Sequence, residues 1–579
     1  MDRIRDLTSP DETYVLLERF KVPHDHGSTD AIAVTVEVSK ILLSFYTLMM
    51  NVIILHLWYL FVLVAIAISA KSKTLTRNMG AANVAIWNSQ APLSVLKAMF
   101  DYRSHIPLYA LGWALAASLA WGAAIVMSLL VSPSLIIGNA APANVAKIYY
   151  PANPPEGLSS LTLTFASLLV PSNLRAIEVL EARDDKTGQK RNTSNFGVVV
   201  EDPRFWKDES GNPNVQVDYS FHVSGVDFGL QLLHDLRLEV QGSCHTEYSW
   251  WDGTYENVDK TPYDQYYLFN NRSTEPKIVS RGDGRGPIAT VFQHGDEGGN
   301  ATFAFLISSL QLLSFSEGTD PWYLTERYED NGTTAGYQVS SGRPPLVCWE
   351  KNAWSRGAGP KFPITEIEKI QGLKSGTVEL FKASLSVPRI IGLTQALGTS
   401  ALKSASTSKG VFFHAGTSSI HSDLQRLVLG AYMATKNTLT ELTMFPEGAD
   451  SQIHNLAFEQ ATGRFKEGVA DFVVLGSNFA ALSIRVLIII PVMTIFLWLT
   501  VYLLTDNPFA PLPWTYVNAL KAPVLYTRID HESLNPEDKG NWNLKSQLPH
   551  FTSEKSLAVA RPQYNRASRT LSWDSSTRS

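Results

Sequence analysis

The sequence contains only two cysteines, Cys244 and Cys348, among its 579 residues. Two thiols cannot build a disulfide-dense scaffold or a metal site with several thiolate ligands. Charged residues are also scarce, at 18% of the chain, and the net charge is −5. This balance gives no electrostatic reason to expect nucleic acid as a partner. The 11% of aromatic residues and the long apolar runs exclude a chain that is disordered throughout.

Familiar catalytic signatures are missing as well. We find no G-x-S-x-G, H-E-x-x-H, P-loop or EF-hand pattern, and no dinucleotide fingerprint that follows a strand. The nearest approach to a nucleophile constellation is FFHAGTSSIHSD, with His414, Ser418, His421 and Asp423. A triad needs a base beside the nucleophile and a third group that orients the base. Ser422 or Asp423 as a helix N-cap is the simpler interpretation, so we predict no catalytic residue, no metal site and no cofactor.

Three long apolar runs predict membrane-spanning helices over residues 41–70, 106–131 and 486–504. A helix rises 1.5 Å per residue, so about 20 residues cross a hydrocarbon core of ~30 Å. Small side chains recur every four residues in the second run and predict close contact with another helix, at Gly112, Ala116, Ala120 and Ala124. These runs predict a membrane protein with three spans and room for oligomerisation through the helices.

Polar residues inside the runs are few. Asn51 and His56 interrupt the first run, and we expect them to bond to a neighbouring helix. Pro491 in the third run favours a kink, which is tolerated in lipid. Residues 1–40 show no cleavable apolar leader, so the first span is the expected targeting signal.

Charge around the spans predicts their orientation. The segment 71–105 has five basic residues and one acid, a net +4, and we place it in the cytosol. The segment 1–40 has five basic and eight acidic residues, a net −3, which suits an exoplasmic tail. Three spans then put residues 138–483 outside and residues 505–579 in the cytosol. Three basic residues at the outer end of the third span run against this rule: Arg464, Lys466 and Arg485.

Two further patterns favour the outer placement of residues 138–483. All four N-glycosylation sequons lie there, at Asn192, Asn271, Asn300 and Asn331. Both cysteines lie there too, and an even pair in an exoplasmic domain predicts one disulfide between Cys244 and Cys348. The alternative is two buried free thiols.

The first two-thirds of this region predict short strands separated by turn clusters such as SGNPN and HGDEGGN. The expected strands are 161–170, 196–200, 215–223, 236–241, 287–293, 302–307 and 345–349. Helical spacing follows at 364–384 and 422–444, the second with a stripe of Leu424, Leu427, Leu429, Met433 and Leu439. Residues 472–482 fit either a buried strand or a helix. Together these elements predict a large β-rich α+β extracytosolic domain.

An aromatic segment, YSWWDGTYENVDKTPYDQYY at 248–267, is the best candidate for a ligand site. Aromatic faces stack on the apolar faces of sugar rings, and neighbouring acids accept bonds from hydroxyl groups. We predict ligand binding by Trp250, Trp251, Asp252 and Tyr255. Two alternatives stay open: an aromatic hairpin that packs against the core near Cys244, and glycan hydrolysis by paired acids.

The segment 505–579 opens with TDNPFAPLPW and has no periodic pattern, so we predict a mostly disordered tail. Arg566 and Arg569 precede Ser572, which predicts a basophilic phosphorylation site at this serine. A solvated tail, or one attracted to anionic lipid, is the alternative.

The segments PPLVCWEKNAW at 344–354 and ELFKASLSVPRIIGLTQALGTSAL at 379–402 resemble uncharacterised multi-pass membrane proteins of filamentous fungi. Those proteins have a large extracytosolic domain in which a Cys-Trp pair is followed by a second Trp. The resemblance covers about sixty residues plus the three-span plan. It implies a location in the plasma membrane or the secretory pathway, and it implies no activity or functional residue.

These observations predict a multi-pass membrane glycoprotein with the lipid bilayer as a partner. We favour a non-enzymatic surface protein that binds or senses a glycan or protein ligand on the exoplasmic side. The alternatives are an ecto-enzyme that acts on glycans and an accessory subunit of a membrane transport complex.

Overall fold

The computed structural model describes residues 13–70, 82, 86, 91–103, 107–150, 177, 197–280, 287–297, 300–330, 333–405, 413–444, 454–505, 562–565 and 570–573. The chain divides into two compact units. Unit 1 comprises residues 1–33 and 139–477, and unit 2 comprises residues 34–138 and 478–579. Residues 13–33, which we expected to belong to an N-terminal tail, thus form part of the same unit as residues 139–477.

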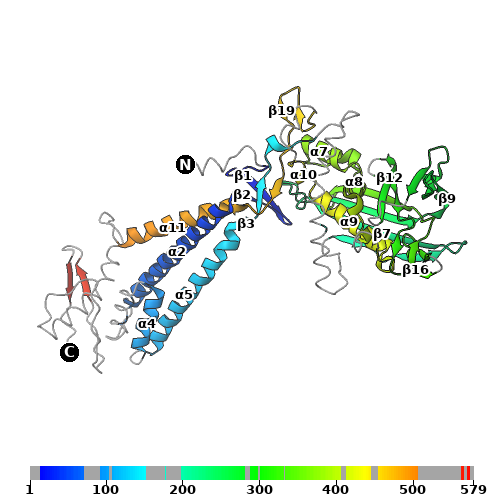
Figure 1. Ribbon diagram of the computed structural model, residues 1–579. Helices are drawn as coiled ribbons and strands as arrows, with labels where there is room; N and C mark the ends of the chain where they lie inside the picture. Colours follow the sequence, from blue (N-terminus) through cyan, green and yellow to red (C-terminus); the bar gives the residue numbers. More distant parts are fainter. Residues whose placement is uncertain are drawn as a thin grey trace. The chain divides into compact units, whose positions relative to one another are not determined.

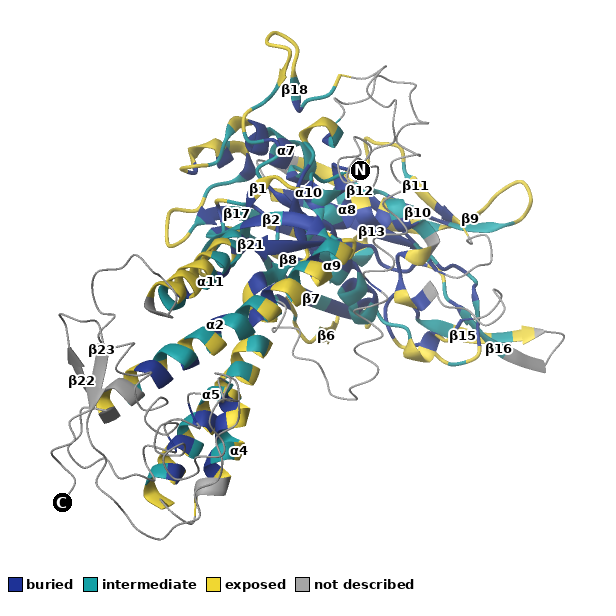
Figure 2. Ribbon diagram, turned by 90° about the vertical axis from the view of Figure 1, so that its left-hand side faces the viewer, coloured by how far each residue is buried: buried dark blue, intermediate teal, exposed yellow. Residues whose placement is uncertain are grey.

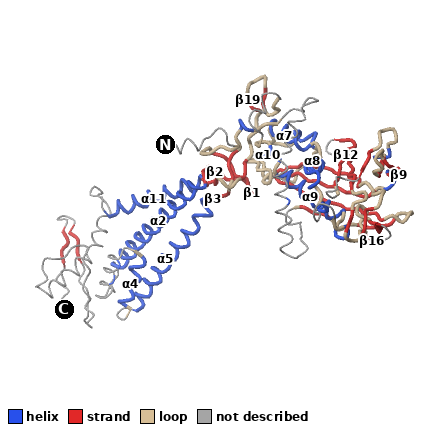
Figure 3. Tube along the Cα trace, in the orientation of Figure 1, coloured by secondary structure: helices blue, strands red, loops and turns tan. Residues whose placement is uncertain are grey.

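Unit 2 contains three helices that are long and apolar enough to cross a membrane (Figures 1 and 3). They are α2 (Val36–Ala70), α5 (Pro107–Leu135) and α11 (Ile484–Thr505). Each predicted span is confirmed as an apolar helix. The first helix begins at residue 36 (predicted 41), the second at 107 (predicted 106) and the third at 484 (predicted 486). Unit 2 also contains a short helix, α4 (Pro92–Tyr102), within the segment that we expected to be a loop.

Hydrogen bonds between the long helices involve few side chains. Tyr46 donates through its hydroxyl group to the carbonyl oxygen of Leu487 at 2.8 Å, and Ser128 donates to Asn51 Oδ1 at 3.1 Å. The predicted interhelical role of Asn51 is therefore confirmed, whereas His56 bonds through Nδ1 to the carbonyl oxygen of Val52 in its own helix. Most of the surface of α11 is exposed (Figure 2), as expected for a helix that faces lipid.

The main element of unit 1 is a seven-stranded antiparallel sheet in the order β12-β13-β17-β8-β7-β5, with β6 paired beside β5 on β7. Its strands are β5 (Val198–Val200), β6 (Arg204–Lys207), β7 (Pro213–Ser224), β8 (Leu236–Thr246), β12 (Ile288–Glu297), β13 (Asn300–Ser308) and β17 (Leu346–Arg356). Alternating apolar residues, as in β7, give one buried and one more open face.

Helices cover the buried face of the sheet. They are α7 (Ser375–Leu385), α8 (Arg389–Leu397) and α9 (Ile420–Lys436), while α10 (Thr438–Glu441) follows α9 and contacts β20 (Val473–Leu475). The ring of Tyr432 in α9 lies 6.0 Å from the ring of Phe221 in β7, and Phe381 of α7 lies 5.0 Å from Trp354 of β17. On this face β17 and β8 are joined by a disulfide between Cys348 and Cys244, which occupy directly opposed positions. The predicted disulfide is thus present.

Two smaller antiparallel sheets complete the β structure near the main sheet. The first is a meander of β9 (Trp251–Glu256), β10 (Pro262–Tyr266) and β11 (Lys277–Ser280), and the second comprises β14 (Leu313–Ser314), β15 (Thr325–Asp330) and β16 (Thr333–Val339). Short pairs elsewhere are β1 (Arg19–His24) with β2 (Gly27–Thr35), β4 (Ala140–Pro142) with β20 (Val473–Leu475), β18 (Phe458–Glu459) with β19 (Arg464–Phe465), and, in unit 2, β3 (Ile136–Gly138) with β21 (Phe479–Ser483).

Short 3-10 helices occupy several connections: η2 (Val145–Lys147), η4 (Tyr248–Trp250), η5 (Leu268–Asn270), η6 (Ile364–Lys369), η7 (Gly398–Ser400), η8 (Lys403–Ala405) and η9 (Ala415–Thr417). The single helix expected at 364–384 is wrong, because the chain forms η6, turns at Gly372 with φ +85° and then begins α7. A positive φ is a conformation that glycine adopts without strain, and it ends a right-handed helix. Residues 472–482, where strand and helix were both open, form strands β20 and β21.

Six of the seven expected strands correspond to β5, β7, β8, β12, β13 and β17, and the expected strand at 161–170 lies outside the described residues. Most of the segment 505–579 also lies outside them. Within it, β22 (Pro562–Asn565) pairs with β23 (Thr570–Trp573), which contains Ser572. The expected stripe on α9 is partly wrong, because Leu429 and Met433 are only half-buried while Val428 and Ala431 are buried.

Candidate functional site

The predicted ligand residues lie at the start of the β9–β10–β11 meander, which packs against the more open face of the seven-stranded sheet. Trp250, in η4, is buried with Tyr266, Leu268 and Val279 against Ala304 and Leu306 of β13. Trp251 and Tyr255 in β9 keep 39% and 43% of their surface exposed, and Asp252 is exposed between them. The structure therefore removes Trp250 from the candidate site and leaves Trp251, Asp252 and Tyr255.

Asp264 of β10 holds the inner side of this hairpin in place. Its buried carboxylate accepts hydrogen bonds from the indole N–H of Trp251 at 3.3 Å, from the hydroxyl group of Thr254 and from the backbone N–H of Gly342 at 2.9 Å. A side chain at position 342 would meet the ring of Trp251 at about 3.0 Å, and φ there is +69°, so the turn requires glycine. Asp264 thus fixes the indole ring and the base of the hairpin.

The outer face of the hairpin carries the accessible polar and aromatic groups. The hydroxyl group of Tyr255 donates to Asp252 Oδ2 at 3.0 Å, and the Tyr255 ring lies 6.0 Å from that of Tyr263 on the paired strand. On the third strand, Ser280 lies opposite Tyr263, and the exposed Ile278 lies opposite Gln265. The turn after β9 is exposed (Figure 2). This face offers flat rings together with a carboxylate and an amide.

Glycan hydrolysis by this hairpin would require two carboxylates that face the same open space. Asp252 is exposed, but the carboxylate of Asp264 is buried beneath the hairpin and accepts hydrogen bonds from four donor groups, the fourth being the hydroxyl group of Tyr266. Asp264 is therefore not available as one of two open carboxylates, whereas Glu256 at the end of β9 and Asp259 in the turn after it are exposed.

Asp423 and Ser418, the acid and the nucleophile of the possible triad, bond to groups other than its histidine side chains. Asp423 is buried and accepts hydrogen bonds from Tyr323 and from both the N–H and the hydroxyl group of Ser404, while Ser418 donates to the carbonyl oxygen of His414. The N-cap of α9 is Ser419, whose hydroxyl group accepts from the N–H of Ser422. The expected N-cap at Ser422 or Asp423 is wrong, because the helix begins at Ile420 and its N-cap lies three residues before Ser422.

The sequence did not predict the hydrogen bond between Ser316 and His414. The hydroxyl oxygen of Ser316 lies 3.0 Å from His414 Nδ1 and also accepts the backbone N–H of Gly416 at 2.9 Å. The pair connects the chain after β14 to η9. Gly416 bonds to the serine and not to the histidine, so it does not orient a base as the third member of a triad does. We interpret it as a structural contact.

A buried acidic cluster attaches the β14–β15–β16 sheet to α9. Asp320 accepts the backbone N–H of Ile420, the first residue of α9, and that of Trp322, each at 3.0 Å. Burial raises the pKa of Asp320 to about 7 and that of Asp423 to about 6, and the charge of Asp423 raises the pKa of Asp320 further. These acids cap a helix and join two elements within the core, which explains their positions without a ligand.

The more open face of the seven-stranded sheet presents a second aromatic side chain. Trp349 of β17 is exposed, and the ammonium group of Lys351 lies 5.2 Å from the centre of its indole ring. Ser243 of β8 lies directly opposite Trp349, and Asp218 of β7 lies opposite Ser243. Gln241 of β8 lies opposite Lys351. The sequence alone does not reveal that these side chains are neighbours, because the register between the strands depends on long-range contacts.

The open hollow between α7 and the β18–β19 hairpin has a volume of about 1070 Å³ and is lined by charged residues. Within it Lys382 pairs with Glu368, and Lys466 pairs with Glu379. Because these charges already neutralise one another, the hollow does not favour a particular ligand.

The asparagines of the two sequons among the described residues are exposed. Asn271 follows η5, and Asn300 begins β13. Asn192 and Asn331 lie outside the described residues.

Residues 170–474 match the model of a family described as a domain of unknown function (DUF8406). The chain belongs to this family. The matched segment lies within unit 1 and includes the seven-stranded sheet, the meander and the helices that cover the sheet. No curated protein matches the chain, and no solved structure matches it.

Proposed function

We propose that this member of the family is a membrane-anchored, non-enzymatic binding protein that recognises glycan chains through the outer face of the β9–β10 hairpin. The observation that supports the proposal best is the contrast within the hairpin. Its inner side is fixed by buried Asp264, whereas Tyr255, Asp252 and the edge of Trp251 stay exposed. A pre-ordered aromatic surface loses little conformational entropy when a ligand binds.

The chemistry of this face suits sugar rings. The Tyr255 and Tyr263 rings offer flat apolar surface for C–H groups, while Asp252 and Gln265 offer acceptors and a donor for hydroxyl groups. A disulfide and two exposed sequons agree with an extracytosolic domain, since disulfides persist in oxidising compartments.

A glycan-binding assay tests this function directly. The full-length protein in nanodiscs would be applied to an array of neutral oligosaccharides, together with the variants Tyr255→Ala, Asp252→Ala and Trp349→Ala. We expect binding that falls about tenfold in each of the first two variants, the loss that ~1.4 kcal/mol of stacking or hydrogen bonding implies. Trp349→Ala is the matched control, because it removes another exposed aromatic ring from the same unit.

Two results would contradict the proposal. One is the absence of any bound oligosaccharide, and the other is binding that Trp349→Ala abolishes while Tyr255→Ala leaves it unchanged. The second result would move the site to the open face of the main sheet.

Orientation is tested separately by endoglycosidase treatment. We expect a mobility shift of the expressed protein that decreases when Asn271 or Asn300 is changed to Gln. Both side chains are exposed, so an unmodified protein in a glycosylating host would contradict the outer placement.

A further inference from the structure

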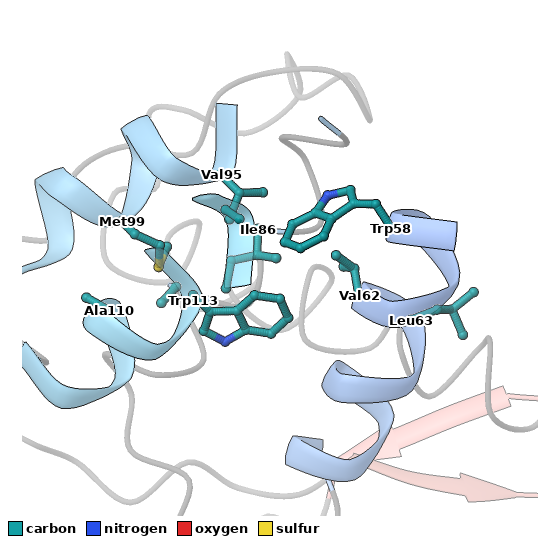
Figure 4. Close-up of a cluster of buried hydrophobic side chains, with 10 residues drawn as sticks. Trp58, Val62, Leu63, Ile86, Val95, Met99, Ala110 and Trp113 are labelled. Carbon is teal, nitrogen blue, oxygen red and sulfur yellow. The ribbon is translucent and has the colours of Figure 1, made fainter. Parts of the chain in front are cut away.

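The end of unit 2 that is remote from residues 34 and 138 contains a cluster of buried apolar side chains from α2, α4 and α5 (Figure 4). Val95 and Met99 of α4 pack with Trp58 and Val62 of α2 and with Trp113 of α5. The rings of Trp58 and Trp113 lie 6.2 Å apart in an edge-to-face arrangement. One face of α4 is therefore fixed against the long helices.

The depth of this cluster follows from the helix rise. Trp58 lies 18 residues after Lys40, the last charged residue before the uncharged run. This separation is about 27 Å along the helix axis, close to the ~30 Å thickness of a hydrocarbon core. The cluster and α4 thus reach the lipid–water boundary opposite Lys40.

The other face of α4 lacks a protein partner in the described part of the chain. Leu93 and Phe100, seven residues apart, are 55% and 63% exposed, and the exposed Lys97 lies between them on the same stripe. Arg103 places its guanidinium group 4.1 Å over the ring of Phe100. Two large apolar side chains that alternate with cations are unsuited to water alone, but they match a lipid surface.

The length of α4 excludes a fourth crossing. Eleven residues extend only about 16 Å, roughly half of the hydrocarbon thickness. An apolar stretch of this length with basic side chains fits an interfacial helix, in which a lysine extends toward the headgroups while neighbouring apolar groups contact the acyl chains.

We propose that the Leu93–Lys97–Phe100 face of α4 is a binding site for anionic phospholipid in the leaflet at this end of the helices. The apolar side chains insert among acyl chains, and Lys97 and Arg103 bind phosphate or carboxylate groups of the lipid heads. The charge of this segment is complementary to an anionic leaflet, since its basic residues outnumber its acids by five to one over 71–105.

Fluorescence labelling at single cysteines tests this site on the full-length protein in nanodiscs. Both native cysteines are in the disulfide, so the variants Leu93→Cys, Phe100→Cys and Ser94→Cys each offer one reactive thiol. Ser94 is the matched control, because it is exposed on α4 beside Leu93 but off the apolar stripe. Quenching would be measured with aqueous iodide and with nitroxide-bearing lipid, with and without phosphatidylserine in the disc.

We expect labels at 93 and 100 to be quenched by the lipid nitroxide and to be several-fold less accessible to iodide than the label at 94. Phosphatidylserine should strengthen this protection, and Lys97→Glu in the labelled variants should remove the lipid dependence. The expected change for one basic side chain is about fivefold in partitioning.

Three results would overturn the proposal. Equal iodide access at positions 93, 94 and 100 would place α4 in water. Protection that phosphatidylserine does not alter would exclude anionic lipid as the ligand. Protection that depends on the number of protein copies per disc, and not on lipid, would assign the face to a second copy of the chain.

Discussion

Two segments of this protein both carry carboxylates and hydroxyl groups, but the two segments differ in how deeply these groups are buried. The segment 248–267 keeps Asp252 and Tyr255 at the surface, while a single buried acid, Asp264, supports them from beneath. In the segment 414–423 and its partners, Asp423 and Asp320 are buried and bonded to hydroxyl groups and backbone amides. Asp252 in the first segment is accessible to solvent, whereas Asp264, Asp320 and Asp423 are buried and accept hydrogen bonds within the fold. Composition alone does not separate these roles, because burial and hydrogen bonding decide them.

The largest expected effect that separates the two segments is a dependence of stability on pH. Burial raises the pKa of Asp320 to about 7 and that of Asp423 to about 6, so the folded protein holds protons that an unfolded chain has already released. The contribution of these two acids to stability is therefore fully present below about pH 4 and is lost as pH rises through about 7, by about 4 kcal/mol for Asp320 and about 3 kcal/mol for Asp423. Hydrogen exchange of peptides from 313–330 and 415–436, measured from pH 4 to 8 with correction for intrinsic rates, would reveal this loss. Peptides from 251–266 that show the same pH slope would contradict the distinction between the segments.

The next largest effect is expected for Asp423→Ala. The substitution leaves Tyr323 and Ser404 with buried donors that have lost their acceptor, so we expect a loss of about 3 kcal/mol in the free energy of unfolding. Thermal unfolding of the full-length protein, followed by tryptophan fluorescence, measures it. Asp423→Asn is the control, because its carboxamide oxygen still accepts a hydrogen bond and should restore part of the loss. A midpoint unchanged in Asp423→Ala would show that the cluster does not support the fold.

A smaller and more local effect is expected for Asp264→Ala. The indole N–H of Trp251, the hydroxyl group of Thr254 and the N–H of Gly342 would lose their shared acceptor, which we expect to cost about 2 kcal/mol within the meander. Faster hydrogen exchange confined to 251–266, with unchanged exchange in α9, is the expected result. Loss of protection throughout unit 1 would mean that Asp264 supports the whole domain and not the hairpin alone.

The smallest effect on stability is expected for Asp252→Ala and Tyr255→Ala, at about 0.5 kcal/mol or less, since both side chains are exposed. The same thermal unfolding experiment provides the measurement. A loss comparable to that of Asp264→Ala would show that these residues serve the fold, and it would contradict a binding role for this face.

The long apolar helices could be predicted from the sequence because an uninterrupted apolar run of about 20 residues matches the thickness of a hydrocarbon core and is rare in water-soluble domains. All strands of the main sheet except β6 were predicted from short runs between turn clusters, with alternating apolar residues in β7 and a continuous apolar stretch in β13. By contrast, α4 was missed because its eleven residues carry Lys97 within a basic segment, and its apolar face is visible only once Val95 and Met99 pack against Trp58.

The candidate site was predicted in part. The aromatic cluster was visible, but the sequence could not distinguish buried Trp250 from exposed Trp251, because both lie in the same dipeptide. The role of Asp264 depends on Gly342, 78 residues later, and no local pattern reports such a contact. The disulfide was predicted from the number of cysteines, whereas its position across adjacent strands depends on the register of β8 and β17.

The segment 139–477 is joined to a long apolar helix at each end, and this has a consequence for proteolysis of the chain. The chain enters the segment 139–477 from α5 and leaves it toward α11. After a single proteolytic cut in this segment, each fragment still contains a long apolar helix: α2 and α5 in the first fragment and α11 in the second. A cut between Cys244 and Cys348, where the exposed turn after β9 lies, also leaves the two halves joined by the disulfide. Separation of the main sheet from all three long apolar helices therefore requires two cleavages that flank the sheet.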